Sequence, residues 1–391
     1  MMKWFLRQIF LRRFDLFVLG FYFSTLVFLI TSLPYYVDVK SHNLLLVEYL
    51  EAGFFPLPPG YYALIYLVDL LIRIKYPFVA SSAIVLTFFF WWKYRLIYSW
   101  FRASLPEFRD TLVFSLVFSF LVVSPIYIPA IDGTLWYLGK FTQTIWHNST
   151  LICVFPFCII LVKKTFNWLE SKDVKDVFPI LAFGLVILLI KPSFLFAYVP
   201  TLPFYLFLRE RKISMSLILS FGIGIVFFLL ILLEKHLIFN WDPMLAELYT
   251  EEEKSQVVLS PLKVWRHFSY EPVFDFISSF PLLILYLAFW QKRAFDSQLF
   301  CFSLILLFFA LAIFLLFAET GYREFHGNFY WQIPIALLLC HLSIVLTVSR
   351  EFLDSGRKYS GKVVVLFLIY LIQVVWGVGY WLRIFSDFIV S

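Results

Sequence analysis

The fold is decided by a run of 20 residues near the start of the chain, FDLFVLGFYFSTLVFLITSL from Phe14 to Leu33. At about 1.5 Å per residue, a helix of this length just crosses a hydrocarbon core of roughly 30 Å. The run is too long for the apolar part of a signal peptide, and no small-residue cleavage site follows it. We therefore expect a first membrane span here.

The composition of the whole chain is that of an integral membrane protein. Of its 391 residues, 62% are hydrophobic, 22% aromatic and only 15% charged, with a mean hydropathy of +0.85. A soluble domain carries about 25% charged residues. The net charge of +6 comes from basic residues in short loops, which excludes a nucleic-acid-binding surface. The four cysteines lie inside apolar runs, so neither a disulfide framework nor a cysteine metal site is expected.

The remaining apolar runs predict an all-α, polytopic transmembrane helical bundle. They cover residues 58–72, 77–92, 111–128, 150–162, 177–190, 192–208, 213–233, 273–290, 299–318, 330–348 and 363–382. The run at 58–72 is short, opens with Pro58-Pro59-Gly60 and contains Asp69, so it suits a helix lying at the membrane interface better than a span.

The distribution of basic residues supports this count. If 58–72 does not span and the N-terminus is cytoplasmic, 21 of the 32 lysines and arginines fall on the cytoplasmic side; if it spans, only 14 do. The sequence thus predicts about 11 spans, with the N-terminus cytoplasmic and the C-terminus external. The same argument splits 177–208 into two short arms with a turn at Lys191.

This topology predicts one transmembrane domain over 1–391, without a soluble domain. Five of the six histidines lie in its external loops, which cover 34–76, 129–149, the turn at 191, 234–272 and 319–329. The loop 34–76 would hold two juxtamembrane interfacial helices, and 234–272 is the other long loop. We therefore expect the chemistry on the external face.

The first external loop carries the strongest candidates. Asp38 directly follows the first span, and His42 and Glu48 lie in a segment predicted as an amphipathic helix over 41–52 that ends at Gly53. A carboxylate at this place can reach both a lipid-linked substrate and water. These three residues are candidates for catalysis and substrate binding. The alternative is that Asp38 and His42 are only solvated loop residues.

A second candidate group is Trp146-His147-Asn148, at the entrance to the 150–162 span. His147 and Asn148 are expected to hydrogen-bond a sugar hydroxyl or a phosphate, and Trp146 to stack on a sugar ring. The alternative is that the polar cluster is only a helix N-cap.

Two further places suit a phosphate group. Lys191 lies beside the N-terminus of the following helix, where Pro192 opens the first turn, although a lysine at a helix end often only extends to the headgroups.

The loop 319–331 gathers Arg323, Glu324, His326 and Asn328 between strongly apolar spans. We expect these four residues to bind substrate, with the guanidinium of Arg323 clamping a phosphate oxyanion. The alternative is a loop that anchors the chain at the interface through an Arg–Glu pair.

The acidic residue at the end of the first span, the juxtamembrane helix and the stretch Gly53-Phe-Phe-Pro56-Leu-Pro58-Pro59 together resemble the GT-C superfamily of membrane glycosyltransferases. The resemblance covers about 65 residues and the overall topology. The chain differs from the best-known members in having no adjacent Asp-Asp or Asp-Glu pair at the loop start and no soluble C-terminal domain.

The resemblance implies Asp38 as the catalytic residue, a polyprenyl-phosphate sugar as donor, a glycan, lipid or other acceptor, and an inner or plasma membrane location. Membrane lipids are the other expected partners, and nucleic acid is not one. No cofactor is certain, although Asp38 and His42 could share a divalent cation; two ligands are few for a metal site.

Two other functions stay open. A lipid-linked polysaccharide polymerase or ligase would use Arg323 and His326 without needing Asp38. A lipid or small-polyol transporter or flippase would need ionisable residues in the middle of spans, and the sequence places most charges at span ends.

Overall fold

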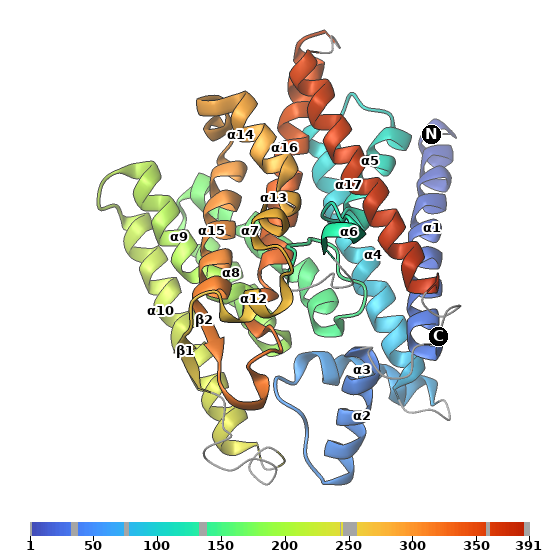
Figure 1. Cartoon of the computed structure of the whole chain (residues 1–391), viewed down its shortest axis with the longest axis vertical. Helices are drawn as coiled ribbons and strands as arrows, with labels where there is room; N and C mark the ends of the chain where they lie inside the picture. The colour runs from blue at the N-terminus through green and yellow to red at the C-terminus, as the bar shows by residue number, and fades with distance from the viewer. Residues whose placement is uncertain are drawn as a thin grey trace.

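The computed structural model describes residues 2–32, 38–73, 78–132, 139–242, 244, 256–356 and 360–386, and this part of the chain forms a bundle of helices (Figure 1). The all-α class is therefore confirmed. Parts of the loops 34–76 and 234–272, including 34–37, 74–77 and 245–255, lie outside the described residues.

The helices follow the apolar runs of the sequence. They are α1 (Met2–Ser32), α2 (Asp38–Glu51), α3 (Gly60–Ile72), α4 (Val79–Ser104), α5 (Asp110–Val122), α6 (Pro129–Asp132), α7 (Ser149–Ser171), α8 (Val177–Ile190), α9 (Ser193–Glu210), α10 (Met215–His236), α12 (Lys263–Phe268), α13 (Pro272–Ser279), α14 (Pro281–Trp290), α15 (Gln298–Leu316), α16 (Ile333–Asp354) and α17 (Gly361–Ser386).

Short elements join these helices. They are the 3₁₀ turns η1 (Val174–Asp176), η3 (Gln291–Asp296), η4 (Gly321–Arg323) and η5 (Asn328–Tyr330), the π-helical turn η2 (Leu237–Trp241), and the strands β1 (Val257–Leu259) and β2 (Phe317–Glu319), which pair antiparallel.

The expected count of 11 spans is not supported. Among the described residues, six helices are long and apolar enough to cross a membrane, and there are seven if α13 and α14, bent by 65°, form one broken span. With 13 and 14 residues, α5 and α8 are too short to cross a core of roughly 30 Å at about 1.5 Å per residue. The run 111–128 yields so short a helix because its last residues leave the helix before Pro125, and Ser124 N–H donates to Gln373 O of α17.

Several local predictions are confirmed. The arms on either side of Lys191 are separate helices of 14 and 18 residues, and α3 is a 13-residue helix too short to span. Gly53, with φ of +82°, follows the end of α2, which begins at Asp38 rather than at residue 41. A glycine tolerates this left-handed conformation without strain.

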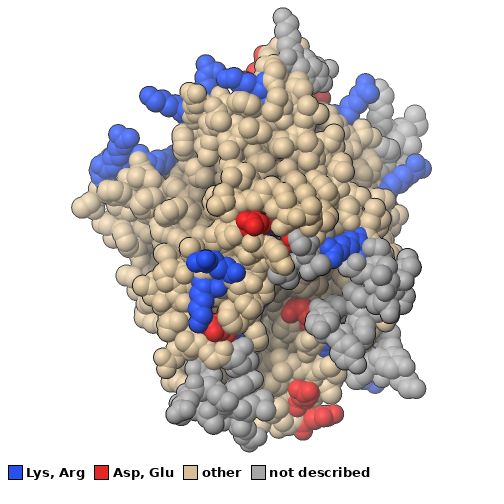
Figure 2. Space-filling view, viewed as in Figure 1, with Lys and Arg blue, Asp and Glu red and all other residues tan. Residues whose placement is uncertain are grey.

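The bundle has a clear polarity. In Figure 1, α2 and α3 lie together beyond one end of the long helices, while α1 begins at the other end. Figure 2 shows Lys and Arg side chains along the upper edge of the visible face and an extended uncharged surface below it. An acidic patch near the centre and further basic and acidic side chains in the lower half interrupt this surface. The centre of the bundle is occupied by α16. Of the apolar stretch within residues 328–354 that is suited to cross a membrane, 94% is buried inside the protein.

Candidate functional site

The carboxylate of Asp38 is held against the first residue of α7. Its Oδ2 accepts the Ser149 N–H at 2.8 Å and the Ser149 hydroxyl at 2.9 Å. The positive end of the helix dipole and the free N–H groups of a first turn favour a negative charge there. The side chain keeps 28% of its surface exposed, so it remains reachable.

Basic groups surround this carboxylate. Burial acts to raise the pKa of Asp38, but the charges of His42, Lys191 and His147 and a hydrogen bond from His42 outweigh it, and the pKa ends well below its usual range. Because the effect of the basic groups prevails, Asp38 stays ionised throughout the physiological pH range.

His42 lies one helical turn after Asp38 on α2, with its Nε2 3.4 Å from Asp38 Oδ2. Its Nδ1 is 2.5 Å from the hydroxyl of Tyr62, near the start of α3. Asn43, the next residue, receives a hydrogen bond from Ser82 of α4 at 2.6 Å, and this bond ties α2 to the bundle. The packing of α2, α3 and α4 thus fixes the position of His42.

Lys191 approaches from the turn between α8 and α9. Its ammonium donates to Thr150 Oγ1 at 2.9 Å and lies 5.5 Å from the ring centroid of Trp331. Burial lowers its pKa to about 8, while the charge of Asp38 acts in the opposite direction. Burial also lowers the pKa of His147, and the charge of Asp38 opposes this shift without cancelling it.

Arg323 of η4 contributes positive charge from the far end of the chain. Burial raises the pKa of Tyr62 well above its usual value, and Arg323 acts on the same hydroxyl to lower it. The guanidinium also lies 5.0 Å from the ring of Phe239. Arg323 therefore belongs to the same electrostatic environment as Asp38 and His42.

The other candidates in the loop 319–331 make contacts that hold the loop in place. Glu324 pairs with Lys263 of α12, and the side-chain amide of Asn328 donates to Glu319. His326 is exposed at the surface of the loop. Burial of part of its side chain, together with the positive charge of Arg323, lowers its pKa. In this loop, the anchoring alternative fits Glu324 and Asn328 better than substrate binding.

Two residues of the Trp146-His147-Asn148 group, Trp146 and Asn148, stabilise the fold and do not face a substrate. Trp146 is fully buried among Tyr22, Phe90 and Phe21, so it presents no face to a sugar ring. Asn148 is the N-cap of α7, and its Oδ1 accepts the Leu151 N–H at 2.9 Å. Asn148 therefore has the role of the N-cap alternative, and Trp146 is a core residue because the loop packs its ring inward.

Glu48 does not join the site. It lies on the exposed face of α2, while Leu46 and Tyr49 of the same helix are buried. The structure therefore brings together Asp38, His42, His147, Lys191 and, through Tyr62, Arg323. This group, together with Ser149, is called the Asp38 cluster below.

Among the residues that the structure describes, no group of three or more His, Cys, Asp and Glu side chains could hold a metal ion. Asp38 and His42 thus contribute at most two ligands to a divalent cation, and further ligands would have to come from a substrate. The residues favour an anion over a bare metal, because basic groups outnumber the carboxylate.

Sequence reasoning did not identify Tyr62 and Ser149 as functional residues. Tyr62 lies in the short apolar run 58–72 that is expected at the membrane interface, and Ser149 directly follows the Trp146-His147-Asn148 group. Their contacts join residues 20 and 111 positions apart in the chain. The only local signal was that each lies in the first turn of its helix, after Pro-Pro-Gly for Tyr62 and after Asn148 for Ser149.

No protein-family model matches this chain, and no curated protein sequence matches it.

Proposed function

We propose that this multi-pass membrane protein is a glycosyltransferase that moves a sugar from a polyprenyl-phosphate donor to a glycan, lipid or other acceptor on the external face. The observation that carries the proposal is the reachable, ionised carboxylate of Asp38, held at the N-terminus of α7 among basic groups. A carboxylate in that setting stabilises the oxocarbenium-like transition state of sugar transfer, and nearby cations bind the donor phosphate. In a site that excludes water, such charge stabilisation contributes substantially to the rate.

The phosphate would lie between Lys191 and Arg323. Lys191 precedes α9, whose first N–H groups point toward the same turn, and a helix N-terminus favours a phosphate group. Arg323 adds a planar fork that matches two phosphate oxygens. Both side chains act electrostatically on the group around Asp38.

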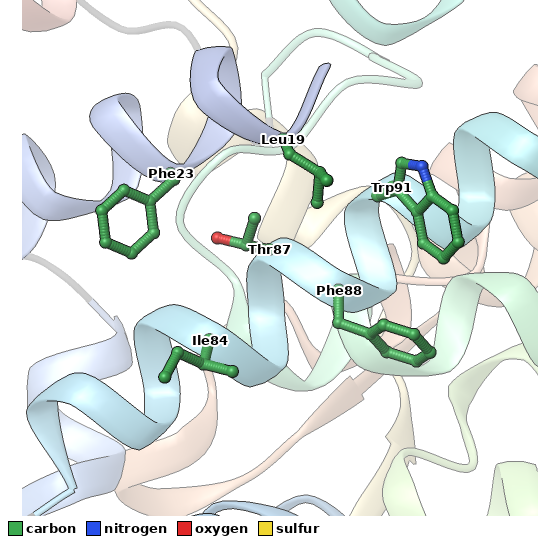
Figure 3. A pocket seen from close by; sticks show the side chains of 6 residues that line it. All are labelled: Leu19, Phe23, Ile84, Thr87, Phe88 and Trp91. Atoms are coloured by element: carbon green, nitrogen blue, oxygen red, sulfur yellow. The ribbon is translucent and has the colours of Figure 1, made fainter. Parts of the chain in front are cut away.

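The lipid chain of the donor has an apolar groove available nearby. A pocket of about 300 Å³ lies between α1 and α4 and is lined by Leu19, Phe23, Ile84, Thr87, Phe88 and Trp91 (Figure 3). Ile84 is two residues from Ser82, which is hydrogen-bonded to Asn43, the neighbour of His42. An isoprenoid chain in this groove would lead toward the Asp38 cluster.

The central test is Asp38→Asn, which keeps the shape of the side chain but removes its charge. We expect sugar transfer from a polyprenyl-phosphate hexose to fall by about 100-fold or more, with donor binding little changed, because the charge stabilises mainly the transition state. Glu48→Gln is the matched control, since it removes an exposed carboxylate from the same helix and should leave the rate unchanged. Wild-type transfer rates in Asp38→Asn would contradict the role of Asp38.

We further propose that the chain lies in the plasma membrane with its N-terminus cytoplasmic and its C-terminus external. Single cysteines at positions 44 and 326 should react with an impermeant thiol reagent from outside, and one at 172 should not. Cys301 is the half-buried native cysteine and is replaced by serine in the background protein. Labelling of position 172 from outside would reverse the orientation.

The polymerase or ligase remains the second candidate. It is favoured by the charge of Arg323, which acts on His326 as well as on Tyr62. An Asp38→Asn protein with full activity and an Arg323→Ala protein with none would favour this function.

A further inference from the structure

We propose that the imidazole of His42, rather than the carboxylate of Asp38, receives the proton of the acceptor hydroxyl, and that the hydroxyl of Tyr62 relays it. This inference rests on the proposed sugar transfer. It assigns Tyr62 a direct role in the reaction and gives Asp38 the role of orienting His42 and stabilising the positive charge that forms.

Asp38 is poorly suited to accept the proton itself. Its Oδ2 already accepts two hydrogen bonds from Ser149. The surrounding basic groups hold the pKa of Asp38 well below the usual range, and an effective general base has a pKa near the working pH.

The hydrogen-bond partners of His42 determine which of its ring nitrogens carries the proton. An ionised carboxylate can only accept hydrogen bonds, so the Nε2 that faces Asp38 at 3.4 Å carries the hydrogen. Nδ1 is then the acceptor, and the Tyr62 hydroxyl, at 2.5 Å, donates to it. The order carboxylate, imidazole, hydroxyl is that of a catalytic triad, with tyrosine in the place of serine.

Two charges favour transfer along this chain of groups toward His42, the carboxylate of Asp38 beside the imidazole and the guanidinium of Arg323 near Tyr62. Asp38 and Tyr61 face the imidazole from α2 and α3, and the Tyr61 ring lies 5.7 Å from it. The charges of Lys191, in the turn between α8 and α9, and of His147, just before α7, act on Asp38. Arg323 acts on the Tyr62 hydroxyl, where a positive charge stabilises the phenolate character that develops as the proton leaves.

Bond formation and bond breaking occur together in the transfer step. The acceptor oxygen bonds to the anomeric carbon while the bond from this carbon to the donor phosphate breaks, and its electron pair leaves with the phosphate. The acceptor proton passes to Tyr62 Oη as the Tyr62 proton passes to His42 Nδ1. The imidazolium is then paired with Asp38 and returns its proton to water after the product leaves. Tyr62 is only 3% exposed, so the acceptor hydroxyl has to enter the site to reach it. The proposal places this entry on the side from which Arg323 acts on the Tyr62 hydroxyl.

The kinetic test measures sugar release from a polyprenyl-phosphate hexose, with water or a membrane lipid extract as acceptor, against pH. The full-length protein in lipid nanodiscs is used. The wild-type rate should rise with pH through one ionisation. In His42→Gln the rate should fall by about 10²- to 10⁴-fold and this rise should disappear. In Tyr62→Phe the rate should fall at least about tenfold and the rise should be displaced. The matched variant Tyr66→Phe, one turn further along α3, should keep the wild-type profile, because the Tyr66 ring packs against Phe55 and Phe78.

Added imidazole should restore activity to His42→Ala, which neither a misfolded protein nor a merely structural histidine would allow. The proposal is overturned if His42→Gln keeps the wild-type pH dependence or if Tyr62→Phe is as active as Tyr66→Phe. A second readout needs no turnover: ¹⁵N NMR of labelled histidines should show the Nε2–H tautomer for His42, and the Nδ1–H tautomer would overturn the relay. Failure of the wild-type protein to use the donor, with the Nε2–H tautomer present, would instead count against the proposed function.

Discussion

Two acid–base clusters in this molecule have opposite arrangements. The Asp38 cluster combines one carboxylate with several basic groups, and Asp38 keeps 28% of its side-chain surface exposed. In the second cluster, the buried triad, the Lys140 ammonium lies 2.8 Å from Asp132 Oδ1 and 3.3 Å from Asp275 Oδ1. All three side chains of the buried triad are less than 5% exposed.

The charged groups of the buried triad find their partners within the protein. Lys140 also donates to Ser278 Oγ at 2.6 Å and to Ile126 O at 3.0 Å, while Asp132 accepts the Ile128 N–H and Asp275 accepts the Ser269 hydroxyl. These contacts connect three parts of the chain: α6, the segment that precedes α7, and α13. The helix α13 is the first half of the bent pair.

The comparison teaches that burial and charge alone do not indicate a functional site. In the buried triad the hydrogen bonds and ion pairs are made within the protein, which suits a connection between segments. In the Asp38 cluster the positive groups exceed the negative one, so an anionic ligand is still attracted.

The largest effect should come from removing the cation of the buried triad. Lys140→Met leaves two buried carboxylates without their cation, which should destabilise the protein by about 3–5 kcal/mol. The melting temperature can be followed with a thiol-reactive fluorophore, since Cys153, Cys158 and Cys340 are buried until the protein unfolds.

The control for this prediction is Lys172→Met, which breaks the exposed ion pair with Glu210 and should cost about 0–1 kcal/mol. If Lys140→Met instead kept the wild-type melting temperature but lost sugar transfer, the triad would have a functional role and the contrast between the two clusters would fail.

An intermediate effect is expected at Arg323. Arg323→Lys keeps the charge but loses the planar fork, so binding of the donor should weaken by roughly 1–3 kcal/mol if the contact is charge-assisted. Binding of a polyprenyl-phosphate hexose in nanodiscs measures this directly. Arg266→Lys, at an exposed position of α12, is the matched control and should bind normally. Unchanged donor affinity in Arg323→Ala would return the loop to an anchoring role.

The smallest effect concerns pH. The pKa of Lys191 is lowered to about 8, so its positive charge is present below this pH and is lost as the pH rises through it. Donor affinity should therefore weaken by up to about tenfold, or ~1.4 kcal/mol, between pH 7 and pH 9. Lys191→Arg, which stays charged, should bind equally at both values. The same pH dependence in Lys191→Arg would assign the effect to another group.

Much of the secondary structure could be predicted from local patterns. Gly53 ends α2, the Lys191-Pro192 turn separates α8 from α9, and the apolar runs become helices, because helix breaks and apolar segments depend on neighbouring residues. The number of spans could not be predicted as well. An apolar run sets where a helix can form, but the helix ends where tertiary contacts replace its own hydrogen bonds, as at Ser124.

By itself, the sequence determined that this chain is helical and apolar enough for a membrane, and that Asp38 and His42 lie four residues apart shortly after the first apolar run. Only the tertiary structure decided which residues complete the Asp38 cluster. It brought Ser149, 111 residues away, to Asp38, turned Trp146 into the core and joined Lys140 to Asp132 and Asp275. The physical reason is that helix formation depends on neighbouring residues, whereas the partner of a charged side chain is set by how distant helices pack.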